Sequence, residues 1–186
     1  MAFVALALAV AGPAQGLHAA EAPKVGERAP DFALTGLDGA TVRLSDATAK
    51  GTVVLVVLRG WPGYQCPICD RQVNELIAAQ AKLSDAHARV IFIYPGPAAD
   101  LLAHATEFKS WKGREWPAQF GFLLDPDYAF TNAYGLRWDS ARETAYPSTF
   151  IADAHGIVRF AKVSRSHGDR SKSADILAAL KSLPSP

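Results

Sequence analysis

From Lys24 onward, apolar and polar positions alternate between segments with strand-like and helix-like periods. Val53 to Leu58 is a continuous aliphatic run between two glycines, which is typical of a central strand covered on both faces. Further strands are expected at 89–94, 120–124, 148–152 and 157–163, and helices at 67–83, 100–109, 173–183 and just before Gly135. Residues 31–35 and 40–44 flank Gly36-Leu37-Asp38-Gly39 and predict an N-terminal hairpin. The alternation indicates one α/β domain.

The helix expected from Pro67 to about Leu83 follows directly on the central strand. Its apolar residues, Cys69, Val73, Leu76, Ile77 and Leu83, fall on one face by their spacing. We therefore expect Cys69 to point toward the core.

The first 22 residues differ in composition from the rest of the chain. Ala2 to Ala11 is an unbroken apolar run that Gly12 and Pro13 would end, and small residues follow where a signal peptidase could cut. The run is about half of the roughly 20 residues needed to cross a bilayer. We predict a signal peptide at 1–22, a domain at 23–186, and a periplasmic or secreted protein that is free of the membrane after cleavage. The stretch contains no Lys or Arg, so a plain apolar tail is the alternative.

Charge and length exclude some classes of function. Nineteen basic and eighteen acidic residues give a net charge of +1, without the basic clusters that phosphate backbones require. We expect no nucleic-acid partner. A chain of 186 residues can bury one sufficient core, so its two cysteines are not needed as staples.

The two cysteines form the sharpest motif, Cys66-Pro67-Ile68-Cys69, at the point where a strand gives way to a helix. One helical turn brings two Cα atoms to about the 5.5 Å that suits a disulfide. The helix amino end stabilises a thiolate and lowers its pKa from about 8.5 toward roughly 3.5 to 7.5. Pro67 suits the first helical position, where an N–H would have no partner. We predict a reversible Cys66–Cys69 disulfide.

An inert buried cysteine pair and a metal site are the alternatives to a redox-active motif. The chain has no second cysteine pair and no His-x-x-x-His, so the sequence predicts no metal and no cofactor. Four histidines beyond the leader, His87, His104, His155 and His167, are expected at the solvated surface.

Several segments together resemble the peroxiredoxin (AhpC/TSA) family of the thioredoxin-like superfamily. They are Ala29-Pro30-Asp31-Phe32, the strand 53–58, Pro62 with Cys69 seven residues later, 123–127, Ala133-Tyr134-Gly135 and 148–153. In that family Pro-x-x-x-Thr-x-x-Cys ends in the thiolate that attacks a hydroperoxide. Here Cys66 replaces the threonine, as in the Cys-x-x-Cys branch called peroxiredoxin-like. The resemblance implies a thioredoxin-like fold with a central mixed β-sheet flanked by helices.

A second departure from the family pattern is Pro147, which stands where the family places an arginine. Pro147 resembles the cis-proline that faces the Cys-x-x-Cys turn of thioredoxins, and the prediction is a cis Tyr146–Pro147 bond close to Cys66; a trans proline opening an edge strand is the alternative. Arg59, Arg71 or Arg142 could substitute for the lost arginine, and Trp61, Tyr64 and Trp138 could wall the site.

The resemblance leaves two enzymatic hypotheses. In the first, Cys69 attacks a hydroperoxide and Cys66 resolves the sulfenic acid as a disulfide. In the second, an exposed Cys66 attacks a protein disulfide and Cys69 resolves the mixed disulfide. We expect the first, with Cys69 and Cys66 as catalytic residues, Pro62, Pro147 and Arg59 at the substrate, and an unidentified thiol as reductant. A copper carrier or an interaction module without catalysis is the third hypothesis.

Overall fold

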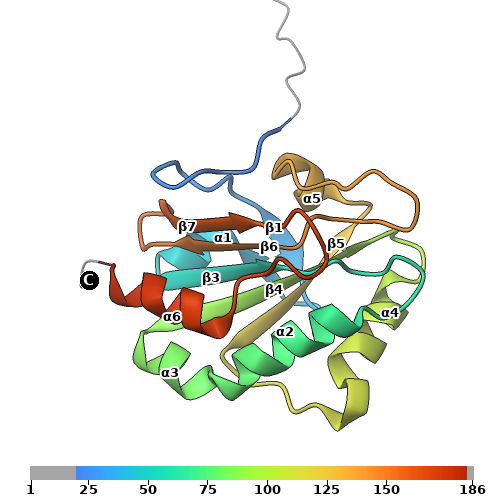
Figure 1. Cartoon of the computed structure of the whole chain (residues 1–186), viewed down its shortest axis with the longest axis horizontal. Helices are drawn as coiled ribbons and strands as arrows, with labels where there is room; N and C mark the ends of the chain where they lie inside the picture. The colour runs from blue at the N-terminus through green and yellow to red at the C-terminus, as the bar shows by residue number, and fades with distance from the viewer. Residues whose placement is uncertain (1–19, 184–186) are drawn as a thin grey trace, which may run out of the picture.

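A five-stranded mixed sheet forms the centre of the computed structural model, which describes residues 20–183 (Figure 1). Its order is β5-β4-β3-β6-β7. The strands are β3 (Thr52–Val57), β4 (Ala88–Gly96), β5 (Phe120–Pro126), β6 (Ser148–Ala152) and β7 (Val158–Val163). β3, β4 and β5 are parallel, whereas β6 is antiparallel to both of its neighbours. The predicted central strand is therefore confirmed, and the last two predicted strands are found paired as a hairpin.

The predicted N-terminal hairpin is also confirmed. β1 (Ala33–Thr35) pairs antiparallel with β2 (Thr41–Arg43), and a short helix that was not predicted, α1 (Leu44–Thr48), follows. The Asp31 carboxylate accepts a hydrogen bond from the Ser45 backbone N–H at 2.9 Å, which ties the start of this helix to the segment before the hairpin.

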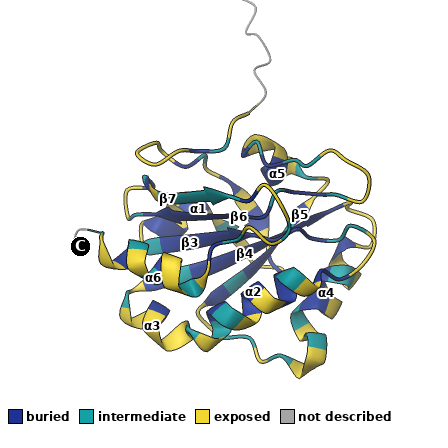
Figure 2. Ribbon diagram, in the orientation of Figure 1, coloured by how far each residue is buried: buried dark blue, intermediate teal, exposed yellow. Residues whose placement is uncertain are grey.

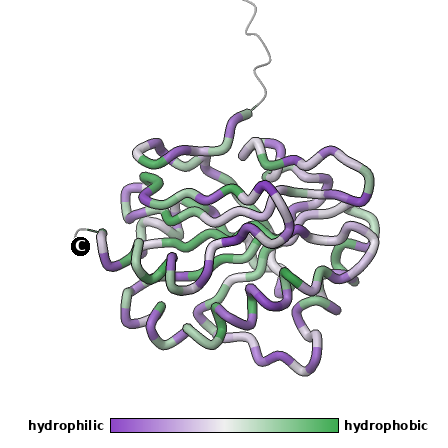
Figure 3. The backbone as a smooth tube through the Cα atoms, viewed as in Figure 1, coloured by the Kyte–Doolittle hydropathy of each residue, from purple (hydrophilic) through white to green (hydrophobic). Residues whose placement is uncertain are grey.

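Two apolar cores lie on opposite faces of the sheet. Along β3, Val54 and Val56 belong to one core and Val53 and Leu55 to the other, as the alternation of side chains in a strand requires. The first core is covered by α2 (Pro67–Ala78), α3 (Gln80–Asp85), α4 (Leu101–Ser110) and α6 (Ser173–Lys181). The second is covered by the hairpin, α1 and α5 (Ala129–Ala133). β3, β4 and β6 are accordingly mostly dark blue in Figure 2, whereas β7 at the sheet edge is largely teal and the outer helix faces are yellow. The central strands are largely green in Figure 3.

The prediction of one continuous helix over 67–83 is wrong. It is divided into α2 and α3 at Ala79, whose φ of −91° and ψ of 5° leave the helical range. Its predicted face is right, because Cys69, Val73 and Leu76 are buried in the first core. A short 3₁₀ turn (Trp111–Gly113) after α4 was not predicted.

The N-terminal leader remains a prediction, because residues 1–19 lie outside the described part of the chain. Within residues 20–183, no helix has the length and apolar character needed to cross a bilayer.

Candidate active site

The two cysteines lie where the chain leaves the central strand and enters α2. Between them and β3 the loop 58–65 passes close to the end of β4, and Gly60 makes this possible: its φ is +73°, and a Cβ there would collide with the Pro95 carbonyl oxygen. Cys66 is the N-cap residue of α2, and its Sγ accepts a hydrogen bond from the Cys69 backbone N–H at 3.3 Å. The sulfur therefore takes the capping role that an oxygen fills in other helices.

Both sulfurs are buried free thiols, with 2% of Cys66 and 1% of Cys69 exposed. The second hypothesis assumed an exposed Cys66, and this assumption is wrong, because its side chain turns inward to cap the helix and Arg170 lies beside it. The predicted orientation of Cys69 toward the core is confirmed.

The two thiols differ in their acidity. A hydrogen bond from the Cys69 side chain, together with the Cys69 backbone N–H and the charge of Arg170, lowers the pKa of the Cys66 thiol to about 5. Burial raises the pKa of the Cys69 thiol, and its hydrogen bond to Cys66 raises it further. At neutral pH the pair therefore carries its negative charge on Cys66, with Cys69 as the protonated donor.

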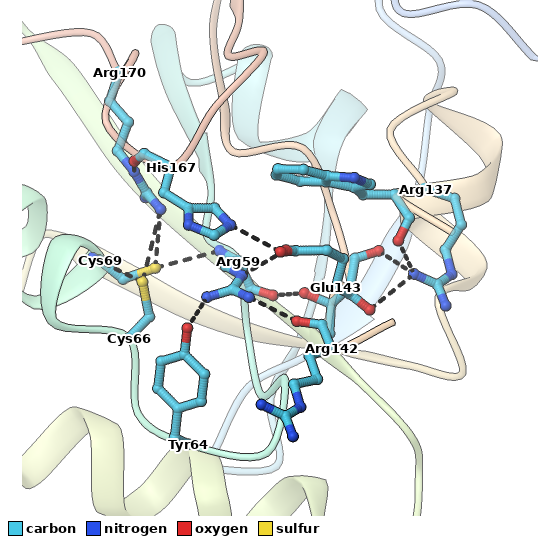
Figure 4. Close-up of polar contacts among 11 residues, drawn as sticks. Arg59, Tyr64, Cys66, Cys69, Arg137, Arg142, Glu143, His167 and Arg170 are labelled. Carbon is cyan, nitrogen blue, oxygen red and sulfur yellow. Dashed lines mark hydrogen bonds and ion pairs between the residues drawn. The ribbon is translucent and has the colours of Figure 1, made fainter. Parts of the chain in front are cut away.

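Arg170, from the loop between β7 and α6, was not predicted to be near the thiols. Its Nη2 lies 3.3 Å from the Cys69 Sγ and 3.8 Å from the Cys66 Sγ (Figure 4). Its Nη1 donates to the Gln72 Oε1 at 2.9 Å, and its Nε donates to the His167 carbonyl oxygen at 2.8 Å. No sequence motif marks this residue, which is separated from Cys69 by 101 positions.

Arg59 contacts the site differently from what was expected. Its backbone N–H donates to the Cys69 Sγ at 3.4 Å, whereas its guanidinium turns to Glu143, with 2.7 Å between Nε and Oε2. The guanidinium also donates to the Tyr64 hydroxyl at 2.5 Å and to the Arg142 carbonyl oxygen at 2.6 Å (Figure 4). The Arg59–Glu143 pair is buried, with side-chain exposures of 3% and 11%.

The other two arginines that were candidates do not reach the thiols in this structure. Arg71 and Arg142 are both exposed, and neither guanidinium hydrogen-bonds to a residue within 20–183. Arg142 contributes through its backbone carbonyl, which holds Arg59.

Pro147 corrects one prediction. The described residues contain no cis peptide bond, so the Tyr146–Pro147 bond is trans. The trans bond lets the chain run extended into β6, with the Pro147 carbonyl accepting from the Ser164 N–H at 2.9 Å. Ser148 pairs with Val57, so Pro147 stands at the end of β3 from which the dithiol loop departs. Pro62 lies half-buried within that loop.

Histidine and aromatic side chains around the site make more contacts with one another and with Glu143 than was expected. The His167 Nε2 is 2.9 Å from the Glu143 Oε1, so this histidine is not the plain solvated residue predicted. Trp138 stacks on Tyr146 with 4.7 Å between ring centroids, and its centroid lies 5.2 Å from that of His167. Trp61 instead stacks on His104 at 3.7 Å.

Across residues 20–183, no group of three or more His, Cys, Asp or Glu side chains is arranged to hold a metal ion. The site formed by Cys66, Cys69 and Arg170 brings together a thiolate, a buried thiol and an adjacent cation. These are the groups that thiol-disulfide exchange uses.

Comparison with known proteins gives a consistent result. The AhpC/TSA family profile matches residues 25–161. Thiol-disulfide oxidoreductase ResA of Geobacillus thermodenitrificans (strain NG80-2) is 29% identical over 142 residues, which are 73% of this chain and 67% of that protein.

Solved structures show the same thioredoxin-like fold. A Chlorobium tepidum protein assigned as thiol:disulfide interchange protein DsbE is 27% identical, with a TM-score of 0.61 over 86% of this chain and 99% of its own. Peroxidoxin BcpB of Mycobacterium tuberculosis, 20% identical, superposes with a TM-score of 0.65 over 88% of this chain and 99% of its own.

Proposed function

The chain belongs to the AhpC/TSA family and is a thiol oxidoreductase, and from this premise we propose that it exchanges its dithiol with protein disulfides. Cys66 is the attacking thiol and Cys69 the resolving thiol. One observation carries the assignment: Cys66 caps α2 with its pKa lowered to about 5, whereas burial raises the pKa of Cys69. The thiolate is the nucleophile in disulfide exchange, so the sulfur that is ionised at neutral pH attacks first.

The reaction proceeds in two exchanges. The Cys66 thiolate attacks one sulfur of the substrate disulfide and releases the other as a thiolate. The Cys69 sulfur then attacks Cys66 in the mixed disulfide, which closes the Cys66–Cys69 disulfide and releases the reduced substrate. A thiol reductant restores the dithiol.

Three further residues border this chemistry in our proposal. Pro62 and Arg59 belong to the loop that carries the dithiol, and Pro147 stands at the adjoining end of β3. We assign them to the surface that receives the substrate. Arg59 has a structural role at this surface, because its guanidinium is held in an ion pair with Glu143.

Hydroperoxide reduction is the second candidate function. The observation that favours it is burial, since only 2% of Cys66 and 1% of Cys69 are exposed and a small oxidant reaches such sulfurs more easily than a polypeptide does. In that reaction Cys69 attacks the peroxide oxygen and Cys66 resolves the sulfenic acid.

Single-cysteine variants separate the two candidates. With reduced protein and insulin as the disulfide substrate, Cys69→Ser should accumulate a mixed disulfide through Cys66, and Cys66→Ser should be inert. The double variant provides the background, and mass spectrometry locates the adduct. A sulfenic acid that forms at Cys69 of Cys66→Ser with hydrogen peroxide, together with no mixed disulfide in Cys69→Ser, would establish the second candidate instead.

Export of the protein remains part of the proposal. The apolar leader within residues 1–22 would direct the chain to an oxidising compartment, where a dithiol needs a dedicated reductant to stay reduced. N-terminal sequencing of the mature protein after cell fractionation tests this. An intact leader on protein from the cytoplasmic fraction would contradict it.

A further inference from the structure

The second exchange presents a chemical difficulty at Cys69. This sulfur must attack as a thiolate, yet it is 1% exposed and burial raises its pKa. A buried thiol usually loses its proton with help from a neighbouring base or cation. Among residues 20–183, the groups that donate to the Cys69 Sγ are the Arg59 backbone N–H at 3.4 Å and the Arg170 Nη2 at 3.3 Å, and no carboxylate is among its partners.

The charge of Arg170 is not paired with a carboxylate in the described chain. No carboxylate oxygen within residues 20–183 comes within 4.0 Å of its guanidinium, and its two other partners, the Gln72 amide oxygen and the His167 carbonyl oxygen, are neutral. The side chain is half-buried, so its charge is only partly screened by water. Among the groups of residues 20–183 that the guanidinium contacts directly, only the thiol pair can carry a negative charge.

The position of Arg170 is fixed from α2 itself. Gln72, one turn after Cys69, accepts from the Nη1 of Arg170 at 2.9 Å and donates to the Ser171 carbonyl oxygen at 3.4 Å. A single guanidinium nitrogen, Nη2, thereby contacts both sulfurs, at 3.3 Å for Cys69 and 3.8 Å for Cys66 (Figure 4).

We propose that Arg170 is a catalytic residue of the second exchange: it stabilises the negative charge that forms on the Cys69 sulfur when this thiol loses its proton and attacks Cys66. The proposal rests on the proposed function, in which Cys66 attacks first. Once Cys66 is bound in the mixed disulfide it carries no charge, and the cation then faces Cys69, its nearer sulfur.

The atoms and electrons of the step balance without another reactant. The Cys69 S–H bond breaks and its proton passes to water. The Cys69 electron pair forms the bond to the Cys66 sulfur, the bond between Cys66 and the substrate sulfur breaks, and the substrate leaves as a thiolate with that electron pair. The dithiol is oxidised by two electrons and the substrate disulfide is reduced by two.

Loss of Arg170 should therefore affect the two exchanges unequally. An adjacent opposite charge lowers a pKa by about 1 to 3 units. With a Brønsted coefficient of about 0.45, a rise of about two units in the pKa of Cys69 slows its attack about tenfold at pH 7. Cys66, with a pKa of about 5, stays at least half ionised at pH 7 after the same rise, so its attack is not slowed.

Dithiodipyridine, a neutral aromatic disulfide, measures both exchanges in one trace. Each reduced protein releases a first thiopyridone when Cys66 attacks and a second when Cys69 closes the disulfide. In stopped-flow measurements at pH 7, Arg170→Met should keep the first release and slow the second about tenfold. Arg170→Lys, which retains the charge, should lie between Arg170→Met and the wild type. Arg165→Met is the matched control on the same loop, since Arg165 is exposed and its guanidinium makes no hydrogen bond within residues 20–183.

Two results would overturn the proposal for Arg170. One is a second release as fast in Arg170→Met as in Arg165→Met, and the other is an equal slowing of both releases. A failure of the proposed function would look different: Cys66→Ser would still give the first release, and Cys69→Ser would not.

Discussion

Two arginines contact the same sulfur of the dithiol, and they differ in their counter-charge. The Arg59 backbone N–H and the Arg170 guanidinium lie at nearly equal distances from the Cys69 Sγ, 3.4 and 3.3 Å. The Arg59 guanidinium is neutralised by Glu143 within a buried pair, whereas Arg170 has only neutral partners besides the sulfurs. The charge of Arg170 therefore lowers the pKa of Cys69, whereas Arg59 lowers it through its backbone N–H alone.

The largest expected effect concerns the Arg59–Glu143 region. Removing one partner of a buried ion pair leaves the other charge uncompensated and costs about 3 to 5 kcal/mol. Glu143→Gln should lower the free energy of unfolding by about this amount, measured by urea denaturation under reducing conditions. Glu115→Gln, at an exposed position, is the control.

A second variant tests whether charge is the cause. The double change Arg59→Met and Glu143→Leu removes both charges and should recover most of the loss, as apolar replacements of buried pairs do. A loss below about 1 kcal/mol in Glu143→Gln would mean that this region does not differ from a surface pair.

The next effect is a pH dependence that belongs to the Arg170 region. The hydrogen bonds from Cys69 and the charge of Arg170 hold the pKa of Cys66 at about 5, while an unfolded thiol titrates near 8.5. Between these values the unfolded chain binds more protons, so the stability of the reduced protein should rise with pH by up to about 1.4 kcal/mol per unit. This stability is lost as pH falls through about 5. The raised pKa of Cys69 acts only above the ordinary thiol value, outside this window.

Urea denaturation of the reduced protein across this window provides the measurement. The rise should be absent from Cys66→Ser, which serves as the reference for all other titrating groups. In Arg170→Met the rise should begin at a higher pH. Parallel curves for the wild type and Cys66→Ser would show that Cys66 is not ionised in this range.

Some sequence predictions were right and others wrong, because the features they concern depend on contacts that span different distances along the chain. The buried run at 53–58 and the dithiol at a helix start depend on neighbouring residues, and both were predictable. The break at Ala79 was missed because the apolar period continues through it to Leu83. The trans bond at Pro147 was missed because its expectation came from a resemblance, while the extended path into β6 decides it.

Arg170 and Glu143 were missed for a different reason. Their partners lie 101 and 84 positions away in the chain, so no local pattern signals the contact. Burial of a charge is also a property of the packed structure. The sequence identified two candidate thiols, whereas the charges near them depend on how the segments after α5 and β7 pack against the loop 58–65 and α2.

A smaller effect is expected at Gln72, which holds Arg170 but carries no charge. Gln72→Leu removes the acceptor for Nη1 and leaves the guanidinium near the sulfurs but less fixed. A loss of about 0.7 kcal/mol of stabilisation corresponds to a second thiopyridone release that is about threefold slower. Asn74→Leu, exposed on the same helix, is the control. A slowing as large as that of Arg170→Met would show that position, rather than charge, is the main contribution.

The smallest effect is expected at His167, the residue that touches both regions. Its ring pairs with the Glu143 Oε1 at 2.9 Å, and its backbone carbonyl accepts from the Arg170 Nε at 2.8 Å. The ring is 36% exposed, so its pair with Glu143 should contribute only about 0.5 kcal/mol. His167→Asn keeps the backbone carbonyl, so the second thiopyridone release should be unchanged while the free energy of unfolding falls slightly. His155→Asn is the control, since His155 is exposed and its carbonyl likewise holds an arginine, Arg28. A tenfold slower second release in His167→Asn alone would mean that Glu143 influences the sulfurs through this ring, and the two regions would then act as one.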